Sequence, residues 1–451
     1  MLQRAVSQAA DTITAALAIT RDPLDADELI ARAQRRTGLV DFGSTPFEEP
    51  LQNLLRACRE EAELSLFGRF ATRWDAVRFL SNLLRLREEE RHAPEILEQR
   101  IERPIFIAGL PRSGTTFLHS LLAQDHTNLV PRVWQLIHPY PLAEPGAGPD
   151  LRPRRVARQL RMFGMLAPEF RRMHPIDASS PQECSEITAH VFASLRFDTT
   201  YHVPSYRRWL DETGHLDAYR FHKRFLQHLQ HQAPVAGHWV LKCPDHIFAL
   251  DALREVYPDA GVVFVHRDPL AVLPSVARLT EVLRRPFTRQ VDKLEIGRQD
   301  SDRWLAATEV MIQAADEERF EQPILHIHYL NLVNNPLETV ATLYRHFGRP
   351  LDPRAAARIS RLVEAKPNGG YGTRRYQLEE YGLDPVVEHE RYARYVDRFA
   401  IRPERRTGSA RSVNGSAARV SARSAEAAEK VNPASPASGA IASDCSTRCA
   451  T

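Results

Sequence analysis

Cysteine, long apolar runs and net charge are all scarce in this sequence. The five cysteines are scattered over 451 residues, and only Cys445 and Cys449 lie close together, so neither a disulfide framework nor a zinc-binding pattern is present. No apolar run reaches the ~20 residues that a membrane-spanning helix needs. Met1 to Arg21 also lacks the basic stretch and continuous apolar core of a signal peptide. We therefore expect a cytoplasmic protein without a transmembrane segment.

The charges nearly cancel, because 60 lysines and arginines face 57 aspartates and glutamates. Nothing in this balance favours nucleic acid as a partner. With 43% hydrophobic residues, the chain can bury the core of one large domain or two modest ones.

The most informative stretch of the chain is Pro104–Leu118. It starts as a short apolar run typical of a buried parallel strand, which Gly109 and Pro111 break before an amphipathic helix begins. A strand, a tight loop and a helix N-terminus together form an anion cradle, because free backbone N–H groups and the helix dipole favour negative charge there. The candidate donors in this loop are Arg112, Ser113, Gly114, Thr115 and Thr116.

Further strands follow, and two of them end on a cation. The strand that starts at Trp239 ends on Lys242. The strand that starts at Gly261 ends on Arg267 and is closed by Pro269, and 324–329 forms another strand. Strands that alternate with helices predict an α/β fold with a P-loop-type parallel sheet flanked by helices. Ligands of such sheets bind at the carboxyl ends of the strands. We expect these cations and Arg112 to meet a shared polyanionic ligand there.

Three regions are expected along the chain. Residues 1–100 form a helical N-terminal cap, 101–402 the α/β domain, and 403–451 a disordered tail rich in Ser, Ala and Arg. The cap's helices are predicted over 24–36, 46–64 and 69–91. Phe70 and Trp74 share the apolar spacing of the third helix and are expected in the core.

Two segments between the first and second predicted strands lie close in sequence to the anion cradle or to Lys242. Prolines interrupt the stretch 131–153, which is a candidate wall of an acceptor site. A helix is expected from Glu183 to about Phe197.

The loop is not a Walker A motif. That motif places Lys directly after its second glycine, whereas Thr115 follows Gly114 here and the cation comes earlier, at Arg112. Neither later strand ends in an aspartate that would hold Mg²⁺. A loop of this kind suits a donor whose transferred group carries less charge than a phosphoryl group, and we expect no metal ion to be required.

Three motifs give the chain a resemblance to a known family. Leu110–Thr116 resembles the 5′-phosphosulfate loop of the sulfotransferases that use 3′-phosphoadenosine 5′-phosphosulfate (PAPS). Val265–Pro269, with Ser275 eight residues after its arginine, is similar to their 3′-phosphate motif. Leu241–Pro244 resembles the strand-end lysine of the protein-tyrosine and bacterial branches. The resemblance spans roughly 41–399 and is closest to the bacterial sulfotransferase-family group.

The resemblance implies PAPS as co-substrate and a role for each motif. Backbone N–H groups of Ser113–Thr116 would hold the 5′-phosphate, and Arg267 and Ser275 would bind the 3′-phosphate. Arg112 and Lys242 would stabilise charge on the bridging oxygen as its bond to sulfur breaks. The acceptor would be a hydroxyl, less readily an amine, of a small molecule or lipid, and a homodimer is one candidate assembly.

The general base is where the sequence departs from these relatives. Many bacterial members carry a Trp-Glu pair downstream of the loop helix, but here Gln135 follows Trp134, and an amide cannot accept a proton at neutral pH. The remaining candidates, of which the first two are preferred, are Glu183, His138, His174 and His246.

Two alternatives from other functional classes stay open. A nucleotide-dependent kinase would show Mg²⁺-dependent ATP hydrolysis, which the missing Walker lysine disfavours. A non-catalytic protein would bind PAPS or its bisphosphate product, PAP, and transfer nothing; Gln135 keeps this second alternative open.

Overall fold

The computed structural model describes residues 24–141, 150–166, 177–233, 237–317, 320–365 and 376–404. The chain divides into two units, Met1–Pro403 and Glu404–Thr451. Nearly all of the predicted tail therefore lies outside the described residues, and so does the candidate base His174. No helix in the described part of the chain is both long enough and apolar enough to span a bilayer.

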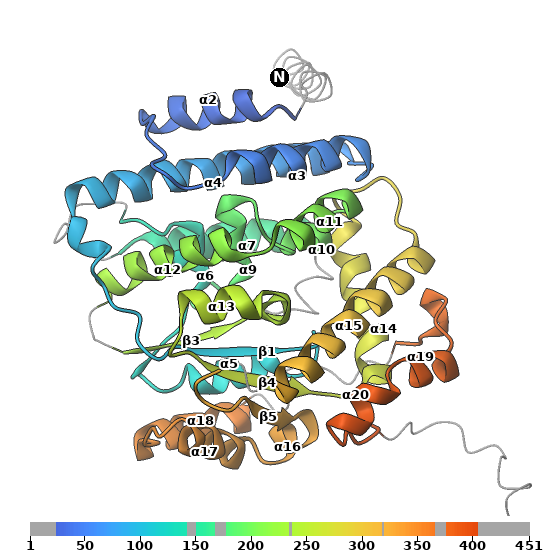
Figure 1. Ribbon diagram of the computed structural model, residues 1–451. Helices are drawn as coiled ribbons and strands as arrows, with labels where there is room; N and C mark the ends of the chain where they lie inside the picture. The colour runs from blue at the N-terminus through green and yellow to red at the C-terminus, as the bar shows by residue number, and fades with distance from the viewer. Residues whose placement is uncertain are drawn as a thin grey trace, which may run out of the picture. The chain divides into compact units, whose positions relative to one another are not determined.

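A parallel sheet forms the centre of the first unit, as the sequence predicts (Figure 1). The strands run in the order β2-β3-β1-β4-β5, and each neighbouring pair is parallel. After β1 the chain crosses to β2 on one side of it, and after β3 it crosses to β4 on the other side. Ligands of parallel sheets bind at such a switch point. The strands are β1 (Ile105–Gly109), β2 (Asn128–Leu129), β3 (His238–Lys242), β4 (Gly261–His266) and β5 (Leu325–His328).

Successive side chains of β1 point to opposite faces of the sheet, because the side chains of a strand alternate with a period of two residues. Ile105 and Ile107 pack into the core shared with α5 (Thr115–Leu122), α16 (Tyr329–Asn334), α17 (Pro336–His346) and α18 (Pro353–Ala365). Phe106 and Ala108 pack into the core on the other side, which α12 (Leu216–His231) and α13 (Leu250–Val256) cover. Both faces are thus buried, which explains why the strands are nearly continuous apolar runs.

The predicted N-terminal helices are present as α2 (Ala26–Thr37), α3 (Glu48–Glu60) and α4 (Leu66–His92). Two of them begin at capping side chains. Asp25 accepts the N–H of Glu28 at 3.0 Å, and Ser65 accepts that of Gly68 at 3.0 Å. The expectation that Phe70 and Trp74 lie in the core is wrong, because they are 50% and 43% exposed on the first turns of α4.

The segment between β2 and β3 contains several helices. Besides α12, the structure describes α6 (Val133–Ile137), α7 (Arg152–Leu166), α9 (Ser185–Thr188), α10 (Arg196–Thr200) and α11 (Pro204–Thr213). The single helix expected from Glu183 to Phe197 is therefore wrong: Phe192 adopts a left-handed conformation with φ 56°, and this ends the helical run.

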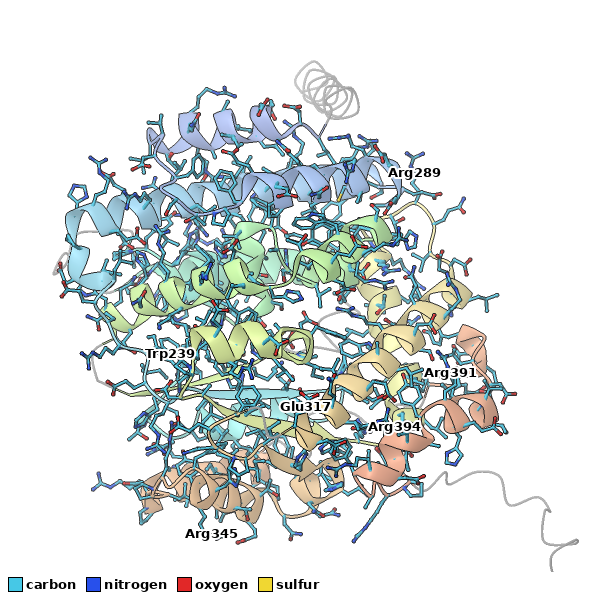
Figure 2. The ribbon with its side chains drawn as sticks, viewed as in Figure 1. Trp239, Arg289, Glu317, Arg345, Arg391 and Arg394 are labelled. Carbon is cyan, nitrogen blue, oxygen red and sulfur yellow. The ribbon has the colours of Figure 1, made fainter. Side chains whose placement is uncertain are left out.

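The last helices are anchored to α15 (Lys293–Asp316), which packs beside α14 (Pro269–Arg284). Figure 2 labels two arginines of these helices: Arg391 of α19 (Pro385–Arg391) pairs with Asp302 at 2.6 Å, and Arg394 of α20 (Ala393–Arg398) pairs with Glu309. Such exposed pairs contribute little free energy individually, so they mainly fix the register of the two helices along α15.

Candidate active site

The loop between β1 and α5 has a tightly constrained backbone. Gly109 and Gly114 have φ angles of 146° and 95°, and Arg112 between them has φ 65°. A Cβ on Gly109 would lie 2.4 Å from the carbonyl oxygen of Val265, and one on Gly114 would lie 2.9 Å from the Tyr329 ring. Side chains at either glycine would therefore displace the loop.

Hydrogen-bond donors without partners gather at this loop. Among the described residues, no hydrogen-bond acceptor is found for the backbone N–H groups of Gly114, Thr115 and Thr116 at the start of α5. The Ser113 hydroxyl is fully buried and also lacks a partner. Buried donors are costly unless paired, so this arrangement fits an anionic ligand.

Lys242 ends β3 directly beside the loop. Its side chain is 2% exposed, and its Nζ donates to Thr116 Oγ1 at 3.0 Å and to Glu183 Oε1. The backbone holds this arrangement, since Cys184 N–H donates to the Lys242 carbonyl at 3.1 Å. Glu183 is itself 29% exposed, so the buried ammonium has a carboxylate partner that solvent can reach.

Arg267 and Ser275 contact the loop from the other side. Arg267, which follows β4, donates through Nη1 to the Arg112 carbonyl and lies 3.9 Å from the centroid of the Tyr329 ring. Arg112 donates through Nε to Ser275 Oγ on α14 at 3.1 Å. The two motifs that lie more than 150 residues apart in the sequence therefore form one constellation.

His138 lies elsewhere, at the C-terminal end of α6. It is 8% exposed, and neither ring nitrogen has a hydrogen-bond partner. Burial, together with Arg155 and Arg78, lowers its pKa to about 4. None of the described hydrogen bonds joins His138 to the loop or to Lys242. Gln135 nearby acts as a cap, because its Oε1 accepts the N–H of Arg132 at 2.9 Å.

The other histidine candidate is enclosed. His246 is bonded through Nδ1 to the Tyr219 hydroxyl and packs edge-on against Phe106, with ring centroids 4.9 Å apart. Burial, followed by the neighbouring His222, lowers its pKa well below the usual value. Its ring therefore stays neutral, and its packing role explains its position.

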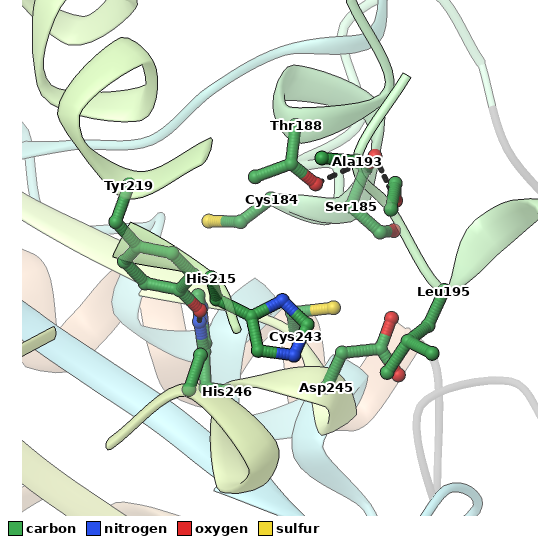
Figure 3. Close-up of a pocket in the computed structure, with 12 residues that line it drawn as sticks. Cys184, Ser185, Thr188, Ala193, Leu195, His215, Tyr219, Cys243, Asp245 and His246 are labelled. Carbon is green, nitrogen blue, oxygen red and sulfur yellow. Dashed lines mark hydrogen bonds between the residues drawn. The ribbon is translucent and has the colours of Figure 1, made fainter. Parts of the chain in front are cut away.

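Figure 3 shows a small cavity whose lining includes the side chains of Cys243, Asp245 and His246. Its volume of about 20 Å³ suffices for roughly one water molecule. Burial, followed by the charge of Glu183, raises the pKa of Asp245 to about 7. The carboxyl group of Asp245 thus lies close enough to Glu183 for the two charges to interact.

A sequence model described as the sulfotransferase family matches residues 104–353, which include the loop, Lys242, Arg267 and Ser275. This chain belongs to the sulfotransferase family. The crystal structure of sulfotransferase STF9 from Mycobacterium avium is 28% identical, has a TM-score of 0.76, and covers 84% of this chain and 98% of STF9. That of STF1 from Mycobacterium tuberculosis H37Rv is 31% identical, with a TM-score of 0.70, over 81% of this chain and 98% of STF1.

A further relative of this sulfotransferase is named for its acceptor. It is the omega-hydroxy-beta-dihydromenaquinone-9 sulfotransferase Stf3 of Mycobacterium bovis, 26% identical over 316 residues, which are 66% of this chain and 74% of Stf3. The comparisons confirm the predicted family and sulfuryl transfer as the reaction class.

The sequence does not predict two residues that lie at the candidate site of this sulfotransferase. Tyr329 braces both Gly114 and Arg267, and Asp245 lies beside the Lys242–Glu183 pair. Both follow observed strands within three residues, at the carboxyl edge of the sheet, although the sequence places Tyr329 in the last predicted strand. The described residues contain no cluster of three or more His, Cys, Asp or Glu side chains that could hold a metal ion.

Proposed function

We propose that this sulfotransferase takes the sulfuryl group from PAPS and transfers it, without a metal ion, to a hydroxyl of a lipid or small molecule, and less readily to an amine. The observation that carries the proposal is the joined constellation of Arg112, Arg267 and Ser275 around a loop of unpaired donors. The scattered cysteines favour the cytoplasm as its compartment.

The two ends of the donor have separate partners in this proposal. The N–H groups of Gly114, Thr115 and Thr116 and the Ser113 hydroxyl receive the 5′-phosphosulfate, which supplies the acceptors that these groups lack. Arg267 and the Ser275 hydroxyl receive the 3′-phosphate. This second phosphate distinguishes PAPS from ATP, whose extra phosphates extend from the 5′ position.

Charge stabilisation at the bridging oxygen is the task of Lys242 and Arg112. The S–O bond to the 5′-phosphate breaks while the acceptor oxygen bonds to sulfur, so negative charge develops on the oxygen that leaves. Lys242 is held by Thr116 directly at the start of α5, and little reorganisation is needed for its ammonium to reach that oxygen. The acceptor attacks in line, and positioning supplies much of the remaining rate.

Glu183 is the base that the geometry supports best. It touches Lys242, whereas His138 makes no contact with that group. Its 29% exposure leaves the carboxylate accessible to an acceptor hydroxyl. When Lys242 turns toward the charge on the leaving oxygen, Glu183 is left to accept the hydroxyl proton.

The acceptor is proposed from chemistry shared with a relative. Stf3 is named for an omega-hydroxylated menaquinone, in which the hydroxyl belongs to an apolar molecule. A hydroxylated lipid or comparable small molecule is therefore the acceptor class to test first.

A transfer assay tests the proposal directly. The protein is incubated with labelled PAPS and a lipid extract, and mass spectrometry searches for products that gain one sulfate. Transfer that disappears in Lys242→Met supports the proposal. Binding of PAP without transfer to any extract would instead favour the non-catalytic alternative, and Mg²⁺-dependent hydrolysis of ATP would favour the kinase.

A further inference from the structure

A cavity of about 290 Å³ lies apart from the donor loop, between the N-terminal helices and the start of α7. We call it the arginine cavity, after four of the residues that line it. None of its lining residues in the described part of the chain is acidic, and none belongs to the donor constellation. The lining residues used below are Arg36, Arg78, Arg85, His138, Tyr140 and Arg155.

Two buried groups in its wall have polar atoms without partners. Both ring nitrogens of His138 and Nη1 of Arg78 are enclosed and make no hydrogen bond within the described residues. The other side of the Arg78 guanidinium is occupied, since Nη2 pairs with Asp75 at 2.9 Å and with Glu186 at 2.8 Å. These pairs fix the guanidinium and leave Nη1 for another acceptor.

The remaining arginines come from three helices. Arg36 lies in the last turn of α2, Arg155 in the first turn of α7, and Arg85 of α4 lies 5.1 Å from the centroid of the Tyr140 ring. Arg36 and Arg155 are exposed, so both can swing toward a ligand. The cavity is thus strongly positive. Three of its arginines, Arg155, Arg78 and Arg36, contribute, after burial, to the low pKa of His138.

We infer that the arginine cavity binds a phosphate group carried by a small organic molecule. Guanidinium forks match the oxygens of phosphate, and His138 and Arg78 supply the enclosed, unpaired contacts of a built site. The volume approaches that of a small-molecule pocket and exceeds the need of one tetrahedral ion, so an organic part has room beside Tyr140. This second ligand site does not depend on the donor or on sulfuryl transfer.

The test follows the His138 ring by NMR in the full chain with ¹⁵N-labelled histidine, where His138→Asn identifies the signal. Phenyl phosphate and inorganic phosphate are the probes. We expect phenyl phosphate to shift the His138 signal saturably and to raise the histidine pKa above about 4, because the bound anion favours the protonated ring. Inorganic phosphate should bind at least tenfold more weakly. Equal affinity would support the oxyanion site but identify free phosphate as its ligand.

A matched pair of variants separates the cavity from general surface charge. Arg36→Gln with Arg155→Gln removes two cavity arginines, whereas Arg35→Gln with Arg154→Gln removes their exposed sequence neighbours, which do not line the cavity. We expect at least a tenfold loss of phenyl phosphate affinity in the first pair and less than a twofold change in the second. Absence of a saturable shift in the unmodified protein, or equal losses in both pairs, would overturn the inference.

Discussion

Arg112 in the loop before α5 donates to Ser275 on α14 at 3.1 Å, and this bond ties the first and last motifs of the site together. The Arg112 carbonyl in turn accepts from Arg267. Both the side chain and the backbone of Arg112 are therefore held in place before any donor binds. Preorganisation of this kind lowers the cost of binding a molecule with two separated phosphates.

Ser275→Ala should weaken binding of PAP by about tenfold, because a hydrogen bond to a charged phosphate contributes roughly 1.5–3 kcal/mol. Adenosine 5′-phosphosulfate, which lacks the 3′-phosphate, should bind with less than a threefold change. Isothermal titration of both ligands measures this difference. Ser120→Ala on α5 is the control, since its hydroxyl donates to the Thr116 carbonyl within the same helix. Equal losses for both ligands would contradict the assignment.

Lys242→Met should reduce turnover by about 10²–10³-fold while the affinity for PAP changes only a few-fold. The ammonium acts on charge that develops in the transition state, so its loss appears in kcat before it appears in binding. Single-turnover kinetics and titration on the same preparation separate the two effects. A loss confined to donor affinity would assign Lys242 to binding alone.

Glu183→Gln should lower turnover by about 10²–10⁴-fold, as expected for a general base, with binding of PAP retained. His138→Asn is the matched comparison, because His138 is the other preferred candidate and makes no described contact with Lys242. Its turnover should stay within about threefold. If His138→Asn loses turnover and Glu183→Gln keeps it, the roles are reversed.

Asp245→Asn should stabilise the protein in alkaline solution. The folded state raises the pKa of Asp245 from 3.8 to about 7, so folding favours the neutral carboxyl group. Below pH 3.8 the carboxyl group is neutral in both states and does not lower the stability of the folded protein. Between pH 3.8 and 7 it lowers this stability progressively, and above pH 7 the loss of stability is constant. Because the carboxyl group is only partly buried, we expect a gain of about 1–2 kcal/mol at pH 8 relative to pH 5. Chemical denaturation at the two pH values measures it, and an equal effect at both would contradict the shift.

The sequence predicts the fold well where periodicity and buried runs are strong. The strands that carry Lys242 and precede Arg267 appear where expected, because continuous apolar runs between loops have few other solutions. The donor loop can be predicted for a related reason. Positions 109 and 114 accept only glycine, so the residue type itself indicates the unusual backbone conformation.

Other features depend on tertiary packing. The helix break at Phe192 has no glycine or proline to signal it, and Phe70 and Trp74 follow the apolar spacing of α4 beyond the part that its neighbours cover. Lys242 and Glu183 pair because α9 begins against the end of β3, and 59 residues separate them in the sequence. Neither spacing nor composition can reveal such a contact.

We propose that the site binds the 3′-phosphate of the donor selectively, and a comparison of PAP with ATP tests this most directly. Isothermal titration without Mg²⁺ should give at least 100-fold tighter binding of PAP than of ATP. In Arg267→Gln most of this preference should disappear, because the guanidinium that we propose binds the 3′-phosphate is gone. Equal affinities in the unmodified protein, or tight ATP binding that requires Mg²⁺, would contradict the account.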